Sequence, residues 1–564
     1  MQIGHRSSMG AMSTVMFERS AMLRRLEAEE FDVVVIGGGI TGVGVALDAA
    51  SRGLRTALVE RDDFASGTSS KSSKLVHGGL RYLQQREIRL VYEALHERQR
   101  LMRNAPHLVS LLPFMIPVLT KDGVLSTKIA RAFGSALWMY DLTGGLRIGR
   151  RHQRLKQGEA FAHLPTMPRE RLAGAYLYFD AAADDARLCV TVARTAAAHG
   201  AAVANRCRVV GLDKDDAGVI AAVRVEADGR SFPVRTRCVV NATGIWADDV
   251  LALDAGTPDA GGPGRSIRPA KGIHVTVPWD KIRNDIAVVI PVPKDRRSLF
   301  VVPWGDRADG TFTHTYVGTT DTDYDGPLDD PQCTAEDLAY VLKALNASVT
   351  TGVTAADITA TWAGLRPLVV SSDGAAPKGA RAKRTADLSR RHRVTVSPSG
   401  LISVFGGKLT TYRLMAQDAV DAVSTHLGRR ARCRTKRLAL LGADGTHRRR
   451  RVPLGHLTGR HGSSAAEIEA LVAARPDLGQ PLVAGLAYLR AEAVWAARHE
   501  MATTVDDVLS RRTRARLLDR HAAMNAADTV AELMGEELGW DGVLMASSAE
   551  AFRSAVRHEI AAEA

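Results

Sequence analysis

The segment FDVVVIGGGITG, residues 31–42, constrains the fold of this chain more than any other part of the sequence. Its first half is a continuous run of mainly Val and Ile, which is typical of a parallel strand buried on both faces. Gly37, Gly39 and Gly42 follow at the spacing G-x-G-x-x-G. In that pattern the first glycine permits a tight turn, the second lets the backbone approach a pyrophosphate, and the third lets the next helix pack against the strand. We expect this helix at about residues 43–53.

An acidic residue follows at the distance that dinucleotide-binding folds use for a ribose. The run Thr56–Glu60, TALVE, predicts a second strand that ends in a carboxylate, which can accept a hydrogen bond from a ribose hydroxyl. The intervening helix directs its N-terminal N–H groups toward the phosphates. G-x-G-x-x-G alone is a weak signal, but a strand, a helix and an acid in register make it strong. The sequence therefore predicts a dinucleotide site, whereas a glycine-rich turn without function would leave the acid unexplained.

Length and composition indicate a multidomain globular protein. A chain of 564 residues is too long for one core and predicts two or three domains. Its 45% hydrophobic and 24% charged residues are ordinary for a soluble protein. No apolar run reaches the roughly 18 residues of a membrane span, since the longest, residues 108–119, is broken by Pro113 and Pro117. Residues 1–30 lack the apolar core of a signal peptide, and we expect a loosely ordered leader there.

The cysteines indicate the redox environment of the protein, and the net charge indicates which classes of partner it could bind. The five cysteines are odd in number and include no C-x-x-C, so neither a disulfide framework nor a metal site is indicated, and a reducing cytoplasm is expected. The net charge of +13 is compatible with nucleic acid, an anionic membrane face or merely a basic surface. Because the basic residues are dispersed and no nucleic-acid motif accompanies them, nucleic acid is not an expected partner.

The rest of the chain alternates between helical and strand-like patterns. Helices are expected over residues 87–104 and 184–199, strands over 202–210, 220–227 and 232–240, and an amphipathic helix over 126–140. The strand that enters NATGIWA, with Gly244, predicts a third parallel strand approaching the dinucleotide. Residues 265–320 give short runs with Pro-rich turns, which favour an antiparallel sheet, and Thr334 with Asp337 predicts a capped helix. A further strand is expected over residues 358–365.

The segment LISVFGGKLTTYR, residues 401–413, repeats the opening pattern of strand, glycine turn and helix. We expect its helix to begin near Lys408, where a second positive dipole end could stabilise negative charge on a reduced cofactor. Beyond residue 435 the composition changes to a basic loop and Ala-, Leu- and Glu-rich helical segments, which indicates a domain boundary.

Several motifs carry a family resemblance. TSSKSSKLVHGGLRYL, NATGIWADDV, YVGTTD, WAGLRPL, SVFGGKLTTYR and RHEMATTVDDVLSRRTR occur in the order seen in FAD-dependent, quinone-linked glycerol-3-phosphate dehydrogenases. The chain resembles that family from about residue 31 to about residue 540. HGGLRYL and FGGKLTTYR are specific to the family, whereas the G-x-G-x-x-G and ATG elements belong to a larger class of FAD oxidoreductases.

The resemblance implies an α/β architecture in three parts. These are a Rossmann-type FAD-binding domain, an antiparallel-sheet substrate domain and an α-helical C-terminal domain. The FAD-binding parts would be about 31–110, 184–255 and 358–430, the substrate parts about 111–183 and 256–357, and the helical domain 435–564, after a leader over 1–30.

The resemblance also implies the cofactor contacts. Gly37, Gly39 and Gly42 would hold the FAD pyrophosphate, and Glu60 the adenosine ribose. Along the pyrophosphate, ribityl chain and flavin ring the implied contacts are Thr68, Ser69, Lys74, His77 and Gly78. At the helix start by the pyrimidine end of the flavin they are Gly407, Lys408 and Leu409, and Gly244 is a further implied contact. Thr41 and Val43 depart from the more usual Asn and Ala, but their side chains point away from the glycine contacts.

By the same resemblance the substrate is sn-glycerol 3-phosphate, which is oxidised to dihydroxyacetone phosphate. A phosphate dianion is bound by guanidinium and ammonium groups. The positions that match the family are Arg81, Tyr82, Arg366, Arg390 and Lys408. At Arg390 the neighbouring Arg391 departs from the usual acid, so the match there is loose.

The implied reaction transfers a hydride from C2 of the substrate to flavin N5 and removes the proton of the C2 hydroxyl. A base working near neutral pH suits histidine. His274, in KGIHVTV, is the first candidate because it lies on the expected substrate sheet, and His77 is the second. Arg366 could stabilise the developing alkoxide, but its high pKa makes it a poor base.

Family members pass their electrons to a quinone on the cytoplasmic face of the membrane. The positive net charge is compatible with peripheral attachment to anionic lipid, for which the amphipathic segment Ser126–Tyr140 is a candidate. A homodimer is a further expectation. The alternatives are a glycerol-3-phosphate oxidase that uses O₂, an FAD-dependent amine or amino-acid oxidase, and a non-catalytic or RNA-modifying flavoprotein.

Overall fold

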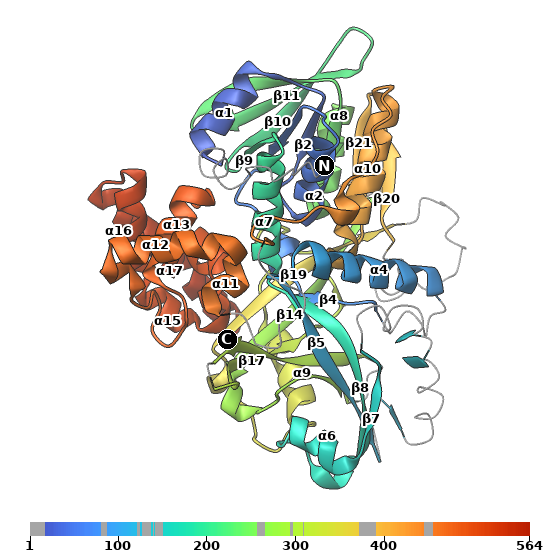
Figure 1. Ribbon diagram of the computed structural model, residues 1–564, viewed down its shortest axis with the longest axis vertical. Coiled ribbons are helices and arrows are strands. Elements are labelled where there is room, and N and C mark those ends of the chain that lie inside the picture. The colour runs from blue at the N-terminus through green and yellow to red at the C-terminus, as the bar shows by residue number, and fades with distance from the viewer. Residues whose placement is uncertain are drawn as a thin grey trace, which may run out of the picture.

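The structure is a computed structural model that describes residues 17–79, 87–120, 125–126, 137–138, 140–141, 150–256, 266–293, 297–307, 309–370, 391–444 and 455–564. Its described part consists of three β-sheets, the helices that cover them and a separate group of C-terminal helices (Figure 1). The six-stranded and eleven-stranded sheets lie at opposite ends of the long axis, and helix α4 (Ile88–Asn104) crosses between them.

The six-stranded sheet is built on the glycine-marked strand. In spatial order it contains β20 (Arg393–Val396), β21 (Leu401–Phe405), β13 (Val239–Asn241), β2 (Val33–Ile36), β3 (Thr56–Val59) and β9 (Ala202–Ala204). All neighbouring pairs are parallel except β20 with β21, which is antiparallel. The predicted parallel strand, its acid-ended neighbour and the third strand before NATGIWA are confirmed.

Helices α2 (Ile40–Ser51), α7 (Asp185–Ala198) and α10 (Tyr412–His426) accompany this sheet, and α2 packs against both of the others. Helix α2 begins three residues before the expected start at Val43, because the glycine turn leads straight into it from Gly39. The expected loose leader differs from the structure at residues 19–28. There helix α1 (Arg19–Ala28) packs on β9 and buries Met22, Leu23 and Leu26.

A smaller four-stranded sheet contains β1 (Glu30–Phe31), β12 (Arg230–Thr236), β11 (Ile220–Ala227) and β10 (Arg208–Lys214). Two strands predicted as continuous are split between this sheet and the six-stranded one. The run 202–210 divides at Arg206, whose backbone φ is +50°, and the run 232–240 divides after Thr236. Because periodicity continues across such a turn, the sequence pattern alone does not reveal it.

The strands of residues 265–320 pair with one another in antiparallel fashion, as predicted, within the eleven-stranded sheet, which also contains two parallel pairs. Its path contains β18 (Thr322–Asp323), β14 (Ile267–Pro278), β17 (Phe312–Gly318), β16 (Ser298–Asp306), β15 (Ala287–Pro291), β5 (Val109–Leu119), β8 (Leu172–Ala183) and β4 (Leu75–Val76). Beside this path lie β19 (Ala360–Val369), β6 (Leu125–Ser126) and β7 (Gln153–Leu155). β19 pairs with β14, so this strand belongs to the large sheet rather than to the FAD-binding part proposed from the sequence.

Helices α6 (Gln157–His163) and α9 (Ala335–Asn346) connect strands of this sheet, and α8 (Ala247–Ala255) lies between β13 of the six-stranded sheet and β14. The predicted cap of α9 is confirmed, because the Thr334 hydroxyl accepts from the Asp337 amide and the Asp337 carboxylate accepts from Thr334 in return. The expected amphipathic helix Ser126–Tyr140 lies mostly outside the described residues. Among the described helices, none is both long enough and apolar enough to cross a bilayer.

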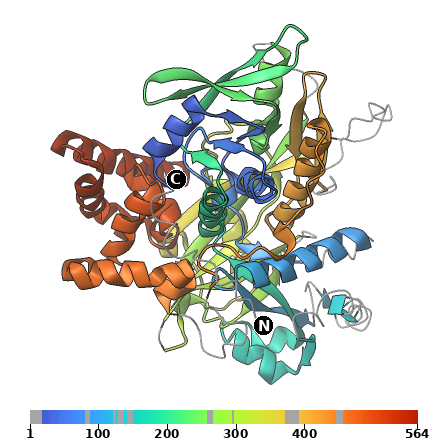
Figure 2. The ribbon, with the colours of Figure 1, turned by 45° about the horizontal axis from the view of Figure 1, so that its top comes forward.

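The C-terminal helices form a core of their own around Trp495. They are α11 (His456–His461), α12 (Ala465–Ala474), α13 (Arg490–His499), α14 (Ala515–Leu518), α15 (Arg520–Asn525), α16 (Ala527–Leu538) and α17 (Gly542–Ala562), with a π-helical turn at Asp507–Arg512. Figure 2 shows these orange and red helices gathered at one side of the molecule. The π-helical turn packs against α7, and α14 packs against β19.

A buried ion pair joins α4 to α10. The Arg413 guanidinium donates to the Glu97 carboxylate at 2.6 and 2.9 Å, and the two side chains are 5% and 1% exposed. A charge pair removed from water in this way is costly to break, because the Glu97 carboxylate would stay buried with only the partly exposed Arg100 as its remaining cation.

We therefore expect Arg413→Met to lower the free energy of unfolding by about 3 kcal/mol. Urea or thermal unfolding of the purified protein measures the change. Arg89→Ala is the control. The Arg89–Glu93 pair lies on α4, as Glu97 does, but it is exposed and should contribute less than about 1 kcal/mol. Equal effects of the two substitutions would contradict the assignment of Arg413 as a buried connector.

Candidate active site

A cavity of about 1840 Å³ opens between the six-stranded and eleven-stranded sheets. Ile36 and Val404 line it from the first sheet, and Val289, Phe300 and Arg366 from the second. Small-molecule sites usually measure about 300–1,000 Å³. This cavity therefore has room for an extended dinucleotide and a small substrate together.

The glycine turn forms one wall. Gly37 has a backbone φ of +108°, and a Cβ there would lie 2.8 Å from the carbonyl oxygen of Ala242. Gly37 and Gly39 line the cavity, whereas Gly42 lies behind them. A Cβ on Gly42 would lie 1.9 Å from the Gly37 carbonyl oxygen, which is inside any permitted contact. Gly42 thus sets how closely α2 approaches the turn, and the other two glycines leave the wall bare of side chains.

The start of helix α2 is capped from another segment. Gly39 is the N-cap residue and has no side chain, and the Ile40 amide donates to the Ser69 hydroxyl at 2.9 Å. Ser69 and its neighbour Thr68 both line the cavity, and the Thr68 hydroxyl donates to the Leu365 carbonyl at 2.6 Å. The cavity wall therefore presents hydroxyl groups next to the positive end of a helix dipole, which favours a bound anion.

Glu60 lies beside this turn and lines the cavity. Its carboxylate accepts from the Gly38 amide at 2.5 Å and from the Asp62 amide at 2.7 Å. Burial raises the pKa of Glu60 to about 7, although the amides of Asp62 and Gly38 oppose that rise. The carboxyl group is thus held at the position where the sequence placed a ribose contact.

Lys74 and Gly78 support the cavity from behind and do not line it. The Lys74 ammonium lies 3.5 Å from the Asp185 carboxylate and 4.5 Å from the centre of the Trp362 ring, and burial lowers its pKa to about 7. The Gly78 amide donates to the Asp180 carboxylate at 3.1 Å. These two positions fix the path of the segment whose other members face the cavity.

The remaining expected cofactor contacts, His77, Gly244, Gly407, Lys408 and Leu409, all line the cavity. Gly406 and Gly407 have φ values of +70° and +89°, so the chain turns there through conformations that side-chain-bearing residues rarely adopt. The turn leads into a short 3-10 helix at Leu409–Thr411, and α10 begins only at Tyr412. The α-helix therefore starts four residues after the expected Lys408, which has extended backbone.

His274 reaches the cavity from β14 and is 2% exposed. Its Nε2 lies 2.9 Å from the Ser73 hydroxyl, and its ring stacks on Trp362 with centroids 4.6 Å apart and an interplanar angle of 8°. The buried Nδ1 has no hydrogen-bond partner among the described residues. Burial, followed by the charges of Lys74 and Arg366, holds the pKa of His274 well below its usual value, so the imidazole is neutral.

Arg366 lines the same cavity from β19 and is oriented by the loop after β17. Its guanidinium donates to the Thr319 hydroxyl at 2.8 Å and lies 3.3 Å from the Asp321 carboxylate. Gly272 leaves space for it, because a Cβ there would lie 2.5 Å from Nη2 of the arginine. The cation is thereby held at the cavity wall with its orientation fixed.

One residue of this wall, Arg297, was not identified from the sequence. Arg297 lines the cavity and donates to the Asp321 main-chain carbonyl at 2.9 Å, so Asp321 contacts two cavity arginines. Asp321 lies in the motif YVGTTD, whereas Arg297 lies in none of the motifs that carry the resemblance. Arg81, Tyr82 and Arg390, which the resemblance implies as substrate contacts, lie outside the described residues.

Comparison with family models identifies two regions. Residues 32–413 match "FAD dependent oxidoreductase", and residues 433–543 match "C-terminal domain of alpha-glycerophosphate oxidase". The residues of the cavity fit that cofactor. The bare wall at Gly37 and Gly39, the start of α2 and the carboxyl of Glu60 match the needs of a diphosphate and a ribose. FAD is the cofactor of this enzyme.

Curated relatives and a solved structure agree with this match. The chain is 40% identical to glycerol-3-phosphate dehydrogenase 2 of Mycobacterium tuberculosis over 97% of this chain and 92% of that protein. It is 37% identical to the human mitochondrial glycerol-3-phosphate dehydrogenase over 96% of this chain and 75% of that protein. The glycerol-3-phosphate dehydrogenase of Bacillus halodurans, solved with FAD, superposes with a TM-score of 0.71 at 27% identity and covers 96% of each chain. The chain therefore belongs to the family of FAD-dependent glycerol-3-phosphate dehydrogenases.

Proposed function

We propose that this enzyme oxidises sn-glycerol 3-phosphate to dihydroxyacetone phosphate and passes the electrons to a membrane quinone. The observation that carries the proposal is the meeting of a neutral His274 and a fixed Arg366 on the wall of the cofactor cavity. The printed names of the relatives supply the substrate class.

The phosphate group would bind to the cationic part of the cavity. Arg366 and Arg297, both in contact with Asp321, and Lys408, which follows the Gly406–Gly407 turn, line it together. Guanidinium groups bind a phosphate dianion through paired hydrogen bonds, and each charge-assisted contact contributes about 1.5–3 kcal/mol. Arg81, Tyr82 and Arg390 remain further proposed contacts on the family resemblance alone.

We assign the general base to His274. A neutral imidazole can accept the proton of the C2 hydroxyl, and the stacking on Trp362 with the bond to Ser73 holds the ring in one orientation. A phosphate dianion beside Arg366 would offset the positive charge that lowers the pKa of His274, so substrate binding would strengthen the base. When bound, FAD supplies the acceptor for the hydride from C2. Arg366 would stabilise the developing negative charge on the C2 oxygen, and His77 is the alternative base.

The electron acceptor and the cellular location of the enzyme are part of the same proposal. The family resemblance supports a quinone acceptor and a peripheral position on the cytoplasmic face of the membrane, and the net charge of +13 suits an anionic lipid surface. The amphipathic segment Ser126–Tyr140 is the proposed attachment site, and a homodimer is the proposed assembly. O₂ as acceptor and an amine or amino acid as substrate are the alternatives.

Anaerobic mixing of the purified flavoprotein with sn-glycerol 3-phosphate tests the proposed reaction. We expect loss of the visible flavin absorbance, followed by its return when a ubiquinone or menaquinone analogue is added. Return only with O₂, together with hydrogen peroxide, would identify the oxidase. Loss of absorbance with an amino acid but not with glycerol 3-phosphate would overturn the proposed substrate.

Replacing His274 tests the proposed base. His274→Ala should lower kcat by about 10²–10⁴-fold, the usual contribution of general base catalysis, and should leave FAD bound. His314→Ala is the matched control, because His314 is a buried histidine on the neighbouring strand β17 that does not line the cavity. We expect His314→Ala to retain kcat. Turnover of His274→Ala close to that of the unmodified enzyme would remove this residue from the mechanism.

The raised pKa of Glu60 predicts a pH dependence of cofactor binding. A ribose hydroxyl donates more strongly to an ionised carboxylate, so FAD affinity should fall as pH falls through about 7. Linkage gives about a tenfold higher Kd at pH 6 than at pH 8, measured by titrating the apoprotein with FAD. Glu60→Gln should abolish this dependence, whereas Glu226→Gln, at an exposed position of β11, should keep it. The same pH profile in both variants would contradict the role of Glu60.

A further inference from the structure

The C-terminal helices approach the cofactor cavity from outside, and their contact with it consists largely of buried arginines. Two strips of chain that line the cavity, residues 60–62 and 66–73, lie on the inner side of this contact. On its outer side lie Arg511, Arg512 and Arg514, in and just after the π-helical turn. All three are buried, at 8%, 1% and 1% exposure.

The first strip is held through Asp63, the residue that follows it. Arg512 donates to both Asp63 carboxylate oxygens at 2.7 Å, and Arg511 Nε donates to one of them at 2.6 Å. Burial alone would raise the pKa of Asp63, but the two guanidiniums outweigh that effect and hold this pKa well below its usual range. Asp63 is fully buried, and Asn205 adds a fourth donor at 3.2 Å. A carboxylate with four donors and two cations cannot shift without breaking several bonds.

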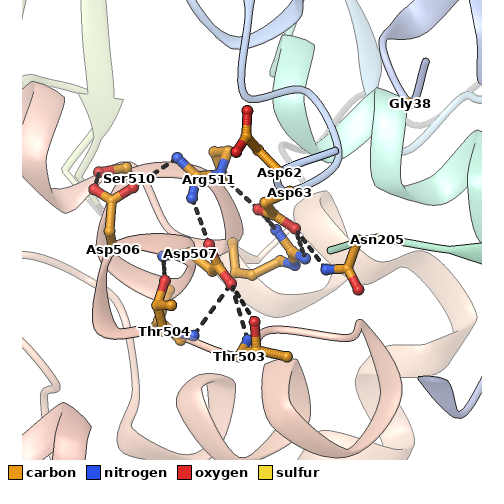
Figure 3. Close-up of polar contacts among 12 residues, drawn as sticks. Gly38, Asp62, Asp63, Asn205, Thr503, Thr504, Asp506, Asp507, Ser510 and Arg511 are labelled. Atoms are coloured by element: carbon orange, nitrogen blue, oxygen red, sulfur yellow. Dashed lines mark hydrogen bonds and ion pairs between the residues drawn. The ribbon is translucent and has the colours of Figure 1, made fainter. Parts of the chain in front are cut away.

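Arg511 is itself held in place by its own domain. Its guanidinium donates to the carboxylates of Asp506 at 2.8 Å and Asp507 at 2.5 Å. Asp507 also accepts from the amides of Thr503 and Thr504 at 2.9 and 3.1 Å. Figure 3 shows these groups converging on the arginine from one side, with Asp63 and Asn205 on the other. Arg511 is therefore held by carboxylates on both sides of the domain contact.

Arg514 holds the second strip. It donates to the Ser70 carbonyl at 2.5 Å and to the Asp185 carboxylate at 2.9 Å. The other oxygen of Asp185 accepts from the Ser72 amide at 3.1 Å and from its hydroxyl at 2.6 Å. Ser69, whose hydroxyl caps helix α2, lies directly before the residue that Arg514 contacts.

We propose that Arg511, Arg512 and Arg514 of the C-terminal domain are positioning residues for FAD. Arg512 and Arg511 fix the loop that carries Glu60, and Arg514 fixes the segment that carries Ser69, so cofactor affinity depends on a domain that contributes no residue to the described cavity wall. The inference concerns the cofactor alone and stands whichever electron acceptor the enzyme uses.

The test compares FAD binding by full-length variants. Arg512→Gln should raise the Kd for FAD at least tenfold, measured by flavin fluorescence on titration of the apoprotein. At saturating FAD its kcat and its KM for substrate should return to the values of the unmodified enzyme. Arg512→Lys keeps the charge but loses the two-pronged bond to Asp63, so it should give an intermediate Kd.

Arg520→Gln is the matched control. Arg520 is a buried arginine of the same domain whose side chain pairs with Glu563, the residue that follows α17, and does not contact the two cavity strips. It should lower stability without changing the Kd for FAD. Equal Kd values for the Arg512 and Arg520 variants would overturn the proposal. If Arg512→Gln does not fold, Arg512→Lys decides, since an unchanged Kd in that variant would equally overturn it.

A double-mutant cycle between Asp63 and Arg512 gives a second readout. Asp63→Asn alone should raise the Kd for FAD at least as much as Arg512→Gln, because it also weakens the bond to Arg511. The double variant should bind FAD no more weakly than Asp63→Asn alone, because the Arg512 contact is already lost in that variant. Fully additive losses would show that Asp63 and Arg512 act on FAD separately and would contradict positioning through their bond.

Discussion

The close approach of three backbone segments around Gly37 is the constraint on which the site depends. The Gly37 turn lies against Ala242 at the end of β13 on one side and against Gly42 of α2 on the other, with no space for a Cβ at either glycine. This packing places the start of α2, the end of β3 and the exit of β13 around one opening. A cavity wall formed by backbone amides can meet a diphosphate without the cost of removing a charged side chain from water.

Charge is distributed around this opening in two ways. Inside the cavity, cations stay at the wall, as Arg366 does beside Asp321, where an anionic substrate can reach them. Outside it, Arg511 and Arg512 of the C-terminal domain are paired with the buried carboxylate of Asp63. Pairs of this kind contribute little net stability but are costly to separate, so they specify one arrangement of the loops that they join. In the proposed mechanism arginine therefore binds the substrate inside the cavity, whereas in the C-terminal domain it fixes the positions of the loops that form the cavity wall.

Much of this arrangement could be predicted from local sequence patterns. The glycine spacing predicted the dinucleotide strand and helix. Alternation with Pro-rich turns predicted the antiparallel layer, and Thr334 predicted a helix cap. The pairing of β19 with β14, the split of a strand at Arg206 and the contact between Arg511 and Asp63 were not predicted. The last of these joins residues 448 positions apart, and neither hydrophobic periodicity nor a short motif carries information over such a separation. The positions of Arg81, Tyr82 and Arg390 rest on the resemblance alone.

The FAD affinity of Gly42→Ala tests the central constraint most directly, because Gly42 carries no proposed chemistry and acts only through packing. A methyl group there must displace α2 from the Gly37 carbonyl, and overpacking of this kind lowers stability by about 1–3 kcal/mol. Because the displaced helix no longer directs its N-terminal amides at the diphosphate, we expect the Kd for FAD to rise about tenfold or more. Gly158→Ala, in helix α6 with open space around it, should leave the Kd unchanged. A Gly42→Ala protein that folds and binds FAD as tightly as the unmodified enzyme would contradict the account.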